Sequence, residues 1–151
     1  MTDRSVTHST FVLEREYDAP PERVFGAWSD QQAKAQWFGA SDFELDFRIG
    51  GREINRGGPD GGPVYTYQAL YQDIVEGERI VYTYDMLMDD TRISVSVATV
   101  EFAPAGDGTR LTYTEQGAFL DGHDTPEQRE GGTGTIFDKL GEVLAAETAN
   151  A

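Results

Sequence analysis

The chain has 151 residues, with 12 basic against 27 acidic side chains, a formal charge of −15 and no cysteine. This length is enough for one domain with its own core, and the lack of cysteine excludes disulfides and Cys-ligated metal centres. Such an acidic surface repels phosphate groups, so we expect no nucleic-acid binding and no membrane insertion. The acidity fits either an ordinary solvated surface or adaptation to high salt. No stretch is apolar enough for a signal peptide or a spanning helix, and we expect a cytoplasmic protein.

The first predicted elements are a strand and two short helices. Residues 9–17 place apolar and charged side chains at alternate positions, the period of a half-buried strand. The prolines at 20–21 end this strand and start a helix over residues 21–28, because proline fits the first helical turn. A second short helix follows, capped by Ser29 or Asp30.

Six further strands follow, separated by tight turns rich in glycine and aspartate. They are predicted over residues 41–47, 52–56, 63–74, 79–86, 92–102 and 109–117. In the fifth of these, the apolar positions change parity between Val97 and Ala98, which predicts a β-bulge. Strands joined by hairpins are antiparallel, so the six form an antiparallel sheet with the first strand.

The last predicted element is a long helix from Thr125 to about residue 147, with an apolar stripe that includes Ile136 and Leu140. The three glycines within residues 131–134 each cost about 1 kcal/mol in a helix relative to alanine. Either the helix begins after them, or they thin its surface where something must fit. A curved sheet with one buried face needs a cover, and only this helix is long enough.

We therefore predict an α+β fold. A curved antiparallel sheet of about seven strands wraps around the long C-terminal helix, and two short helices follow the first strand. The domain is a single one over residues 9–147. The ends, residues 1–8 and 148–151, are expected to be flexible.

Short motifs over much of the chain point to a known family. They read YDAPPERVF from Tyr17, WF at Trp37, GG at Gly50, ERIVYTY from Glu78, GTRL from Gly108 and EQGAF from Glu115. In this order they resemble the START-like superfamily, also called SRPBCC or polyketide-cyclase/Bet-v-1-like, and within it the activator of heat-shock-protein-90 ATPase type. The resemblance implies a helix-grip fold whose sheet and C-terminal helix enclose a cavity for lipids, polyketides or other apolar molecules.

One segment departs from the family. The family often has a Gly-Trp pair early in the last helix, whereas this chain has GGTGT over residues 131–135. The missing bulky side chain is expected to enlarge or open the cavity at this point.

The candidate ligand site is the inward face of the sheet with the facing helices. We expect ligand contacts from Trp37, Phe38, Glu53, Arg56, Tyr65, Tyr67, Tyr84, Met86, Glu115, Phe119, Thr133, Ile136 and Phe137. Glu115 shares the parity of apolar neighbours and should point inward, where a carboxylate needs a partner or a proton. Arg56 and Arg129 are its candidate partners. With a partner, Glu115 is a fixed anion; without one, it is a candidate proton donor.

Three functions are consistent with these features. The leading hypothesis is binding of a small hydrophobic or aromatic ligand, lipid-like or polyketide-like, without a cofactor or a metal. The second is a cyclase or hydratase in which Glu115 or a tyrosine moves a proton, although the chain has no cysteine and no Gly-x-Ser-x-Gly elbow, and no catalytic residue is assigned. The third, suggested by the family name alone, is a co-chaperone-like stimulator of a heat-shock ATPase. A monomer and a homodimer both remain open.

Overall fold

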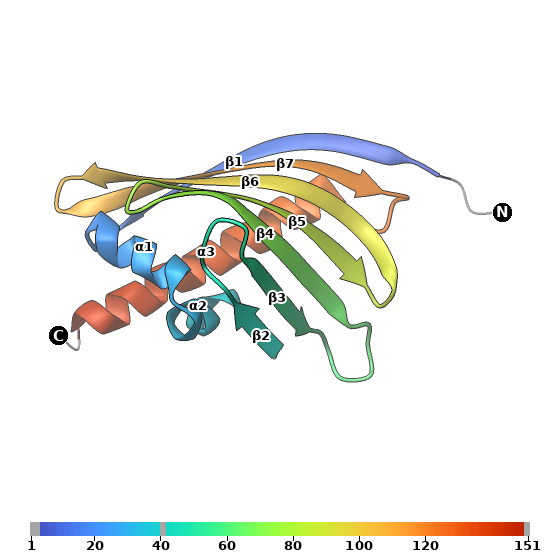
Figure 1. The fold of residues 1–151 in the computed structure, drawn as a ribbon, viewed down its shortest axis with the longest axis horizontal. Coiled ribbons are helices and arrows are strands. Elements are labelled where there is room, and N and C mark those ends of the chain that lie inside the picture. Colours follow the sequence, from blue (N-terminus) through green and yellow to red (C-terminus); the bar gives the residue numbers. More distant parts are fainter. Residues whose placement is uncertain (1–3, 40–41, 150–151) are drawn as a thin grey trace.

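The computed structural model describes residues 4–39 and 42–149. One antiparallel sheet curves over a long helix, and its strand order is β1-β7-β6-β5-β4-β3-β2 (Figure 1). The strands are β1 (Val6–Tyr17), β2 (Asp42–Leu45), β3 (Arg52–Gly57), β4 (Tyr65–Val75), β5 (Arg79–Met88), β6 (Thr91–Ala105) and β7 (Gly108–Leu120). The predicted α+β helix-grip fold with seven strands is confirmed.

Three helices lie on the concave side of this sheet (Figure 1). They are α1 (Pro21–Ser29), α2 (Gln31–Phe38) and α3 (Pro126–Ala149). Asp30 caps α2 by accepting a 2.9 Å hydrogen bond from the Ala33 amide, and Thr125 caps α3 by accepting one of 3.1 Å from the Gln128 amide. The glycines at 131–134 lie inside α3, so the helix does not begin after them.

The strand ends differ from the prediction in several places. β1 begins at Val6 rather than at residue 9, because β7 runs to Leu120 and pairs with Val6 in register. Residues 6–8, which we expected to be flexible, therefore belong to the sheet. Ser41, predicted to start the second strand, lies outside the described residues, as do 1–3 and 150–151 of the expected flexible ends.

The predicted bulge exists at a different position. β6 pairs with β5 as Met86 opposite Ser94 and Leu87 opposite Arg92, which leaves Ile93 as the extra residue. Beyond that point the serines at 94 and 96 face inward and the valines at 95 and 97 face solvent. The predicted parity change at Val97 was wrong, because the run of inward positions starts with buried serines rather than with valines.

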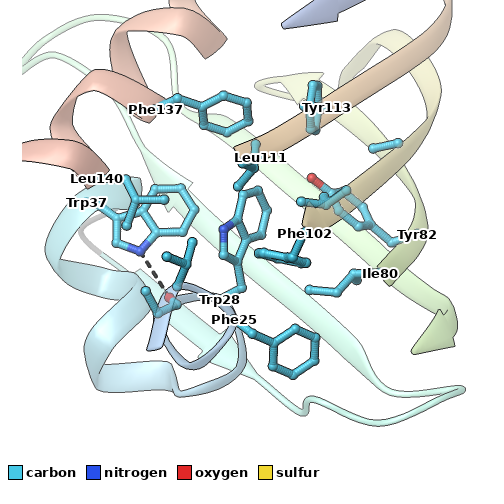
Figure 2. Close-up of a cluster of buried hydrophobic side chains, with 14 of the residues drawn as sticks. Phe25, Trp28, Trp37, Ile80, Tyr82, Phe102, Leu111, Tyr113, Phe137 and Leu140 are labelled. Carbon is cyan, nitrogen blue, oxygen red and sulfur yellow. Dashed lines mark hydrogen bonds between the residues drawn. The ribbon is translucent and has the colours of Figure 1, made fainter. Parts of the chain in front are cut away.

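An aromatic core fills the space between α1, α2, the sheet and the C-terminal half of α3 (Figure 2). Trp28 and Trp37 meet edge to face, with ring centroids 4.8 Å apart, and the Trp37 indole N–H donates a 3.0 Å hydrogen bond to the Ala27 carbonyl. Phe137 and Leu140 of α3 close the cluster. Burial of large rings stabilises this end of the molecule, since each buries on the order of 150–250 Å².

Candidate ligand-binding site

A cavity of about 380 Å³ lies between the N-terminal half of α3, the end of α2 and the inner face of β3, β4 and β5. Its deep wall consists of buried rings: Trp28, Tyr67, Tyr82, Tyr84, Tyr113 and Phe137. Strand alternation places these tyrosines inward, because side chains at every second position share one face. Exposed residues such as Arg56, Gly58 and Tyr65 form its rim.

Most of the predicted site residues line this cavity, and four do not. Those that line it are Phe38, Arg56, Tyr65, Tyr67, Tyr84, Met86, Thr133, Ile136 and Phe137. Glu53 and Glu115 are fully buried outside the lining, Trp37 belongs to the aromatic core, and Phe119 packs under the Arg129 guanidinium at 5.1 Å. The predicted contacts did not include several other residues that line the cavity, among them Trp28, Tyr82, Tyr113, Asp124 and Gln128.

Four side chains donate hydrogen bonds to the Glu115 carboxylate. We call Glu115 and these four side chains the Glu115 cluster: Glu115, Tyr84, Ser96, Tyr113 and Arg129. The Tyr84 hydroxyl lies 2.8 Å from both carboxylate oxygens, and the Tyr113 hydroxyl donates to one of them. Ser96 Oγ donates to the other at 2.9 Å, where Arg129 Nη1 also approaches to 3.3 Å. Glu115 is therefore a fixed anion, paired with one of its two predicted partners.

Arg129 ties this cluster to the start of α3. Its Nη2 donates to Ser94 Oγ at 2.7 Å and to Asp124 Oδ2 at 2.9 Å. Burial disfavours the charged guanidinium, but the neighbouring Tyr84, Glu115 and Asp124 outweigh it and raise the pKa of Arg129 above its ordinary value. The guanidinium therefore stays charged at any physiological pH and neutralises part of the buried carboxylate charge.

A second buried carboxylate lies on β3, and we call its set the Glu53 cluster: Lys34, Glu53, Asn55 and Tyr71. Lys34 Nζ is 2.6 Å from Glu53 Oε1, and both side chains are fully buried. The Tyr71 hydroxyl donates to the same oxygen, and Asn55 Nδ2 donates to Oε2 at 2.7 Å. Burial lowers the pKa of Lys34, and the adjacent Glu53 opposes that shift.

Lys34 was not predicted as the partner of a buried carboxylate, and the prediction that Arg56 is such a partner was wrong. Arg56 has the opposite parity to Asn55, and its guanidinium pairs at 3.3 Å with Asp42, its cross-strand partner on β2. Lys34 lies three residues before Trp37 in α2, on the same buried face. That spacing, together with an inward-facing Glu53, was the available signal.

The helical glycines differ in what surrounds them. A Cβ atom at Gly131 or at Gly132 would meet nothing within 4 Å, whereas one at Gly134 would lie 3.1 Å from an Arg15 nitrogen. Gly132 lines the cavity and Gly131 does not. The glycine at 132 thus leaves open space where a side chain would narrow the cavity.

Two further findings bear on the class of protein. Within residues 4–39 and 42–149, no three His, Asp or Glu side chains gather as a metal-binding group. Over the same part of the chain, no helix is long and apolar enough to cross a bilayer.

A curved antiparallel sheet that grips a long C-terminal helix, with a ring-walled cavity between them, defines a START-like protein of the SRPBCC superfamily. Residues 18–145 match the family model described as activator of Hsp90 ATPase homolog 1-like protein. The chain belongs to this family. No functionally curated protein matches it.

Solved structures agree with this assignment. An uncharacterised protein from Rhizobium leguminosarum is 44% identical, with a TM-score of 0.92 over 96% of this chain and 99% of that one. The Mll3558 protein from Rhizobium loti is 46% identical, with a TM-score of 0.87 over 92% of this chain and 99% of that one. DynU16, a protein of the dynemicin biosynthetic locus, is 16% identical with a TM-score of 0.69 over 90% of this chain and 47% of that one, and this likeness shows the fold alone.

Proposed function

We propose that the protein binds a small hydrophobic or aromatic molecule in the cavity between α3 and the sheet. The observation that carries this proposal is the cavity itself, about 380 Å³ in volume and walled by buried aromatic rings. Ligand pockets typically measure about 300–1,000 Å³ and have mostly apolar walls with a few polar groups. A molecule of one to a few rings, lipid-like or polyketide-like in character, is the class that suits this size and lining.

The state of the buried carboxylates favours binding over proton transfer. Glu115 is outside the cavity lining and is saturated by hydroxyl groups and Arg129. Burial raises the pKa of Tyr67, Tyr84 and Tyr113 well above the ordinary value, so these hydroxyls are neutral. Neutral tyrosines and a saturated anion are suited to shaping a wall rather than to moving a proton.

The two other hypotheses have no observation in the structure that favours them. The family description names ATPase activation, and the fold alone does not transfer function between relatives. Cyclase or hydratase chemistry would need a titrating group in contact with the ligand. We keep both as alternatives to ligand binding.

A cavity-filling substitution tests the proposal. Gly132→Leu places a side chain in the open space of the cavity, and Gly131→Leu is the matched control, because it makes the same helix-favouring change outside the lining. The probe is N-phenyl-1-naphthylamine, a neutral dye that fluoresces in apolar surroundings. We expect the natural protein and Gly131→Leu to bind it equally, and Gly132→Leu to bind it at least about tenfold more weakly.

Circular dichroism and melting curves establish that both variants are folded. Equal binding by all three proteins would place the dye elsewhere and contradict the proposal. An absence of binding by the natural protein would contradict it as well.

A further inference from the structure

Three buried polar atoms on side chains that line the cavity have no hydrogen-bond partner within residues 4–39 and 42–149. They are the Trp28 indole N–H, the Asn55 side-chain oxygen and the Tyr67 hydroxyl, and the Asn55 and Tyr67 residues are only 4% and 7% exposed. The last two of these atoms carry the inference. Both residues line the cavity, and they are direct cross-strand partners of β3 and β4, so their side chains share the inner face. Buried polar atoms are nearly always paired, so two unpaired atoms on side chains that line a cavity indicate what the cavity receives.

The orientation of the Asn55 amide is fixed by the Glu53 cluster. Its Nδ2 donates a 2.7 Å hydrogen bond to Glu53 Oε2, and Lys34 and Tyr71 hold the other carboxylate oxygen. A flipped amide would direct its oxygen at the carboxylate, which only accepts hydrogen bonds. The unpaired atom of this cavity-lining side chain is therefore an acceptor, and a ligand must supply a donor to satisfy it.

Tyr67 offers a neutral hydroxyl beside this acceptor. Burial, followed by neighbouring Tyr82 and Glu53, raises its pKa well above the ordinary value. Its ring packs on Tyr84 with centroids 4.6 Å apart, which holds the ring in place. The Tyr82 hydroxyl lies close enough to act as a weak partner of the Tyr67 hydroxyl. Among the described residues, no group meets both the distance and the angle of a hydrogen bond to the Tyr67 hydroxyl.

The Trp28 indole N–H, also without a hydrogen-bond partner, is a different case. Figure 2 shows its nitrogen on the side that faces Trp37, and the two rings meet edge to face at 4.8 Å. This N–H lies among the rings of the aromatic core.

We propose that the ligand carries a neutral hydrogen-bond donor, in its simplest form an aromatic hydroxyl, which donates to Asn55 Oδ1 and pairs with the Tyr67 hydroxyl. This inference rests on the proposed binding function and names the chemistry of the ligand. A hydroxyl both donates and accepts, so it satisfies both atoms. A carboxylate presents only acceptors to Asn55 and adds negative charge to a chain of net charge −15, so it is disfavoured.

The selectivity that follows is large, because a site built to hydrogen-bond a hydroxyl rejects the analogue that lacks it. The analogue leaves the buried acceptor unpaired and displaces solvent without replacing its hydrogen bonds. We expect 2-naphthol to bind at least about tenfold more tightly than 2-methoxynaphthalene, which has the same rings and no donor. We expect 2-naphthoate to bind more weakly than 2-naphthol.

The test is isothermal titration of the natural protein with these three compounds, followed by two variants. Asn55→Leu removes the acceptor at similar size, and Tyr67→Phe removes the hydroxyl alone. In either variant the ratio of the affinities for 2-naphthol and for its methyl ether should fall several-fold. The comparison of the three ligands uses the natural protein, so its result does not depend on whether the variants fold.

Each outcome decides a different claim. Equal affinity for 2-naphthol and 2-methoxynaphthalene, or tighter binding of 2-naphthoate, overturns the hydroxyl inference and leaves the binding function standing. Loss of all binding with the three compounds, and also with N-phenyl-1-naphthylamine, overturns the binding function and this inference with it.

Discussion

The two buried carboxylates, Glu53 on β3 and Glu115 on β7, have similar neighbours, but the hydrogen-bond networks around them end differently. Each is fully buried, and each has a cation and at least one tyrosine hydroxyl within hydrogen-bond distance. In the Glu115 cluster, the bonds continue through Arg129 to Ser94 and Asp124. In the Glu53 cluster, they end at Asn55, whose side chain lines the cavity and whose oxygen has no partner in the part of the chain that the structure describes.

This difference separates polar groups whose hydrogen bonds are all made within the protein from a polar group that is available to bind a ligand. A satisfied network rigidifies the wall, because every donor and acceptor has one arrangement. A network that ends in an unpaired acceptor has a place for a ligand atom, and its other members hold that acceptor still. The Glu115 cluster thus supports the cavity, and the Glu53 cluster orients the polar group that the cavity presents.

High pH should break both clusters and give the largest effect. Burial raises the pKa of Tyr71, Tyr84 and Tyr113 above the ordinary value of 10.0. Their contribution to stability is complete below about pH 10 and is lost as pH rises, because the unfolded tyrosines release protons that the folded ones keep. Each lowers the free energy of unfolding by about 1.4 kcal/mol per pH unit above that point.

Urea unfolding at about pH 8, about pH 10 and about pH 11 measures this loss. Absorbance at the tyrosinate band, recorded in the same samples, should rise mainly as the chain unfolds. Stability that stays constant across this range would show that the tyrosine hydroxyls are not buried as described.

Removing the cation from each cluster sharpens the comparison. Lys34→Met leaves Glu53 fully buried and unpaired, and should cost about 3–5 kcal/mol of unfolding free energy. Arg129→Met should cost less, about 2 kcal/mol, because three hydroxyls still donate to Glu115. Denaturant unfolding of the two variants under the same conditions compares the costs.

A double variant provides the control. Lys34→Met combined with Glu53→Gln removes both charges and should recover most of the stability lost in Lys34→Met. If Arg129→Met is the more damaging of the two single changes, the ranking of the clusters is wrong.

A smaller effect distinguishes the closed cluster from the open one. Ser96→Ala removes a donor from Glu115 and should cost about 1.5 kcal/mol. Asn55→Ala also removes a donor from a buried carboxylate, but it removes an unpaired acceptor at the same time, so its cost should be roughly half as large. Equal costs in thermal or urea unfolding would indicate that the Asn55 oxygen is already satisfied.

Much of this architecture followed from alternation and turn residues. The inward parity of Tyr67, Tyr84 and Glu115 was predictable, because one face of each strand carried the apolar neighbours. The bulge was predicted at the wrong position, because Ser94 and Ser96 are buried. Ser94 accepts a hydrogen bond from Arg129 and Ser96 donates one to Glu115. In the sequence alone, a serine at such a position is read as a surface residue.

The local pattern held only one indication that Lys34 is buried, its three-residue spacing from Trp37 in α2. α2 reads QQAKAQWF, in which a lysine between alanines is typical of a solvated helix face. Its burial depends on the approach of β3, which is set by the whole sheet. The unpaired state of the Asn55 oxygen depends in turn on that ion pair, so it could not be predicted before the pair was known.

The most direct test of ligand binding in this cavity is a set of amide chemical shifts recorded while 2-naphthol is added to the ¹⁵N-labelled protein. Gly57, Gly58 and Gly132 line the cavity, whereas Gly77 and Gly106 lie in remote turns between strands. We predict saturable shifts at the first three glycines and none at the other two. Shifts at Gly77 and Gly106 as large as those at Gly132, or no saturable shift at any of the five, would contradict the account.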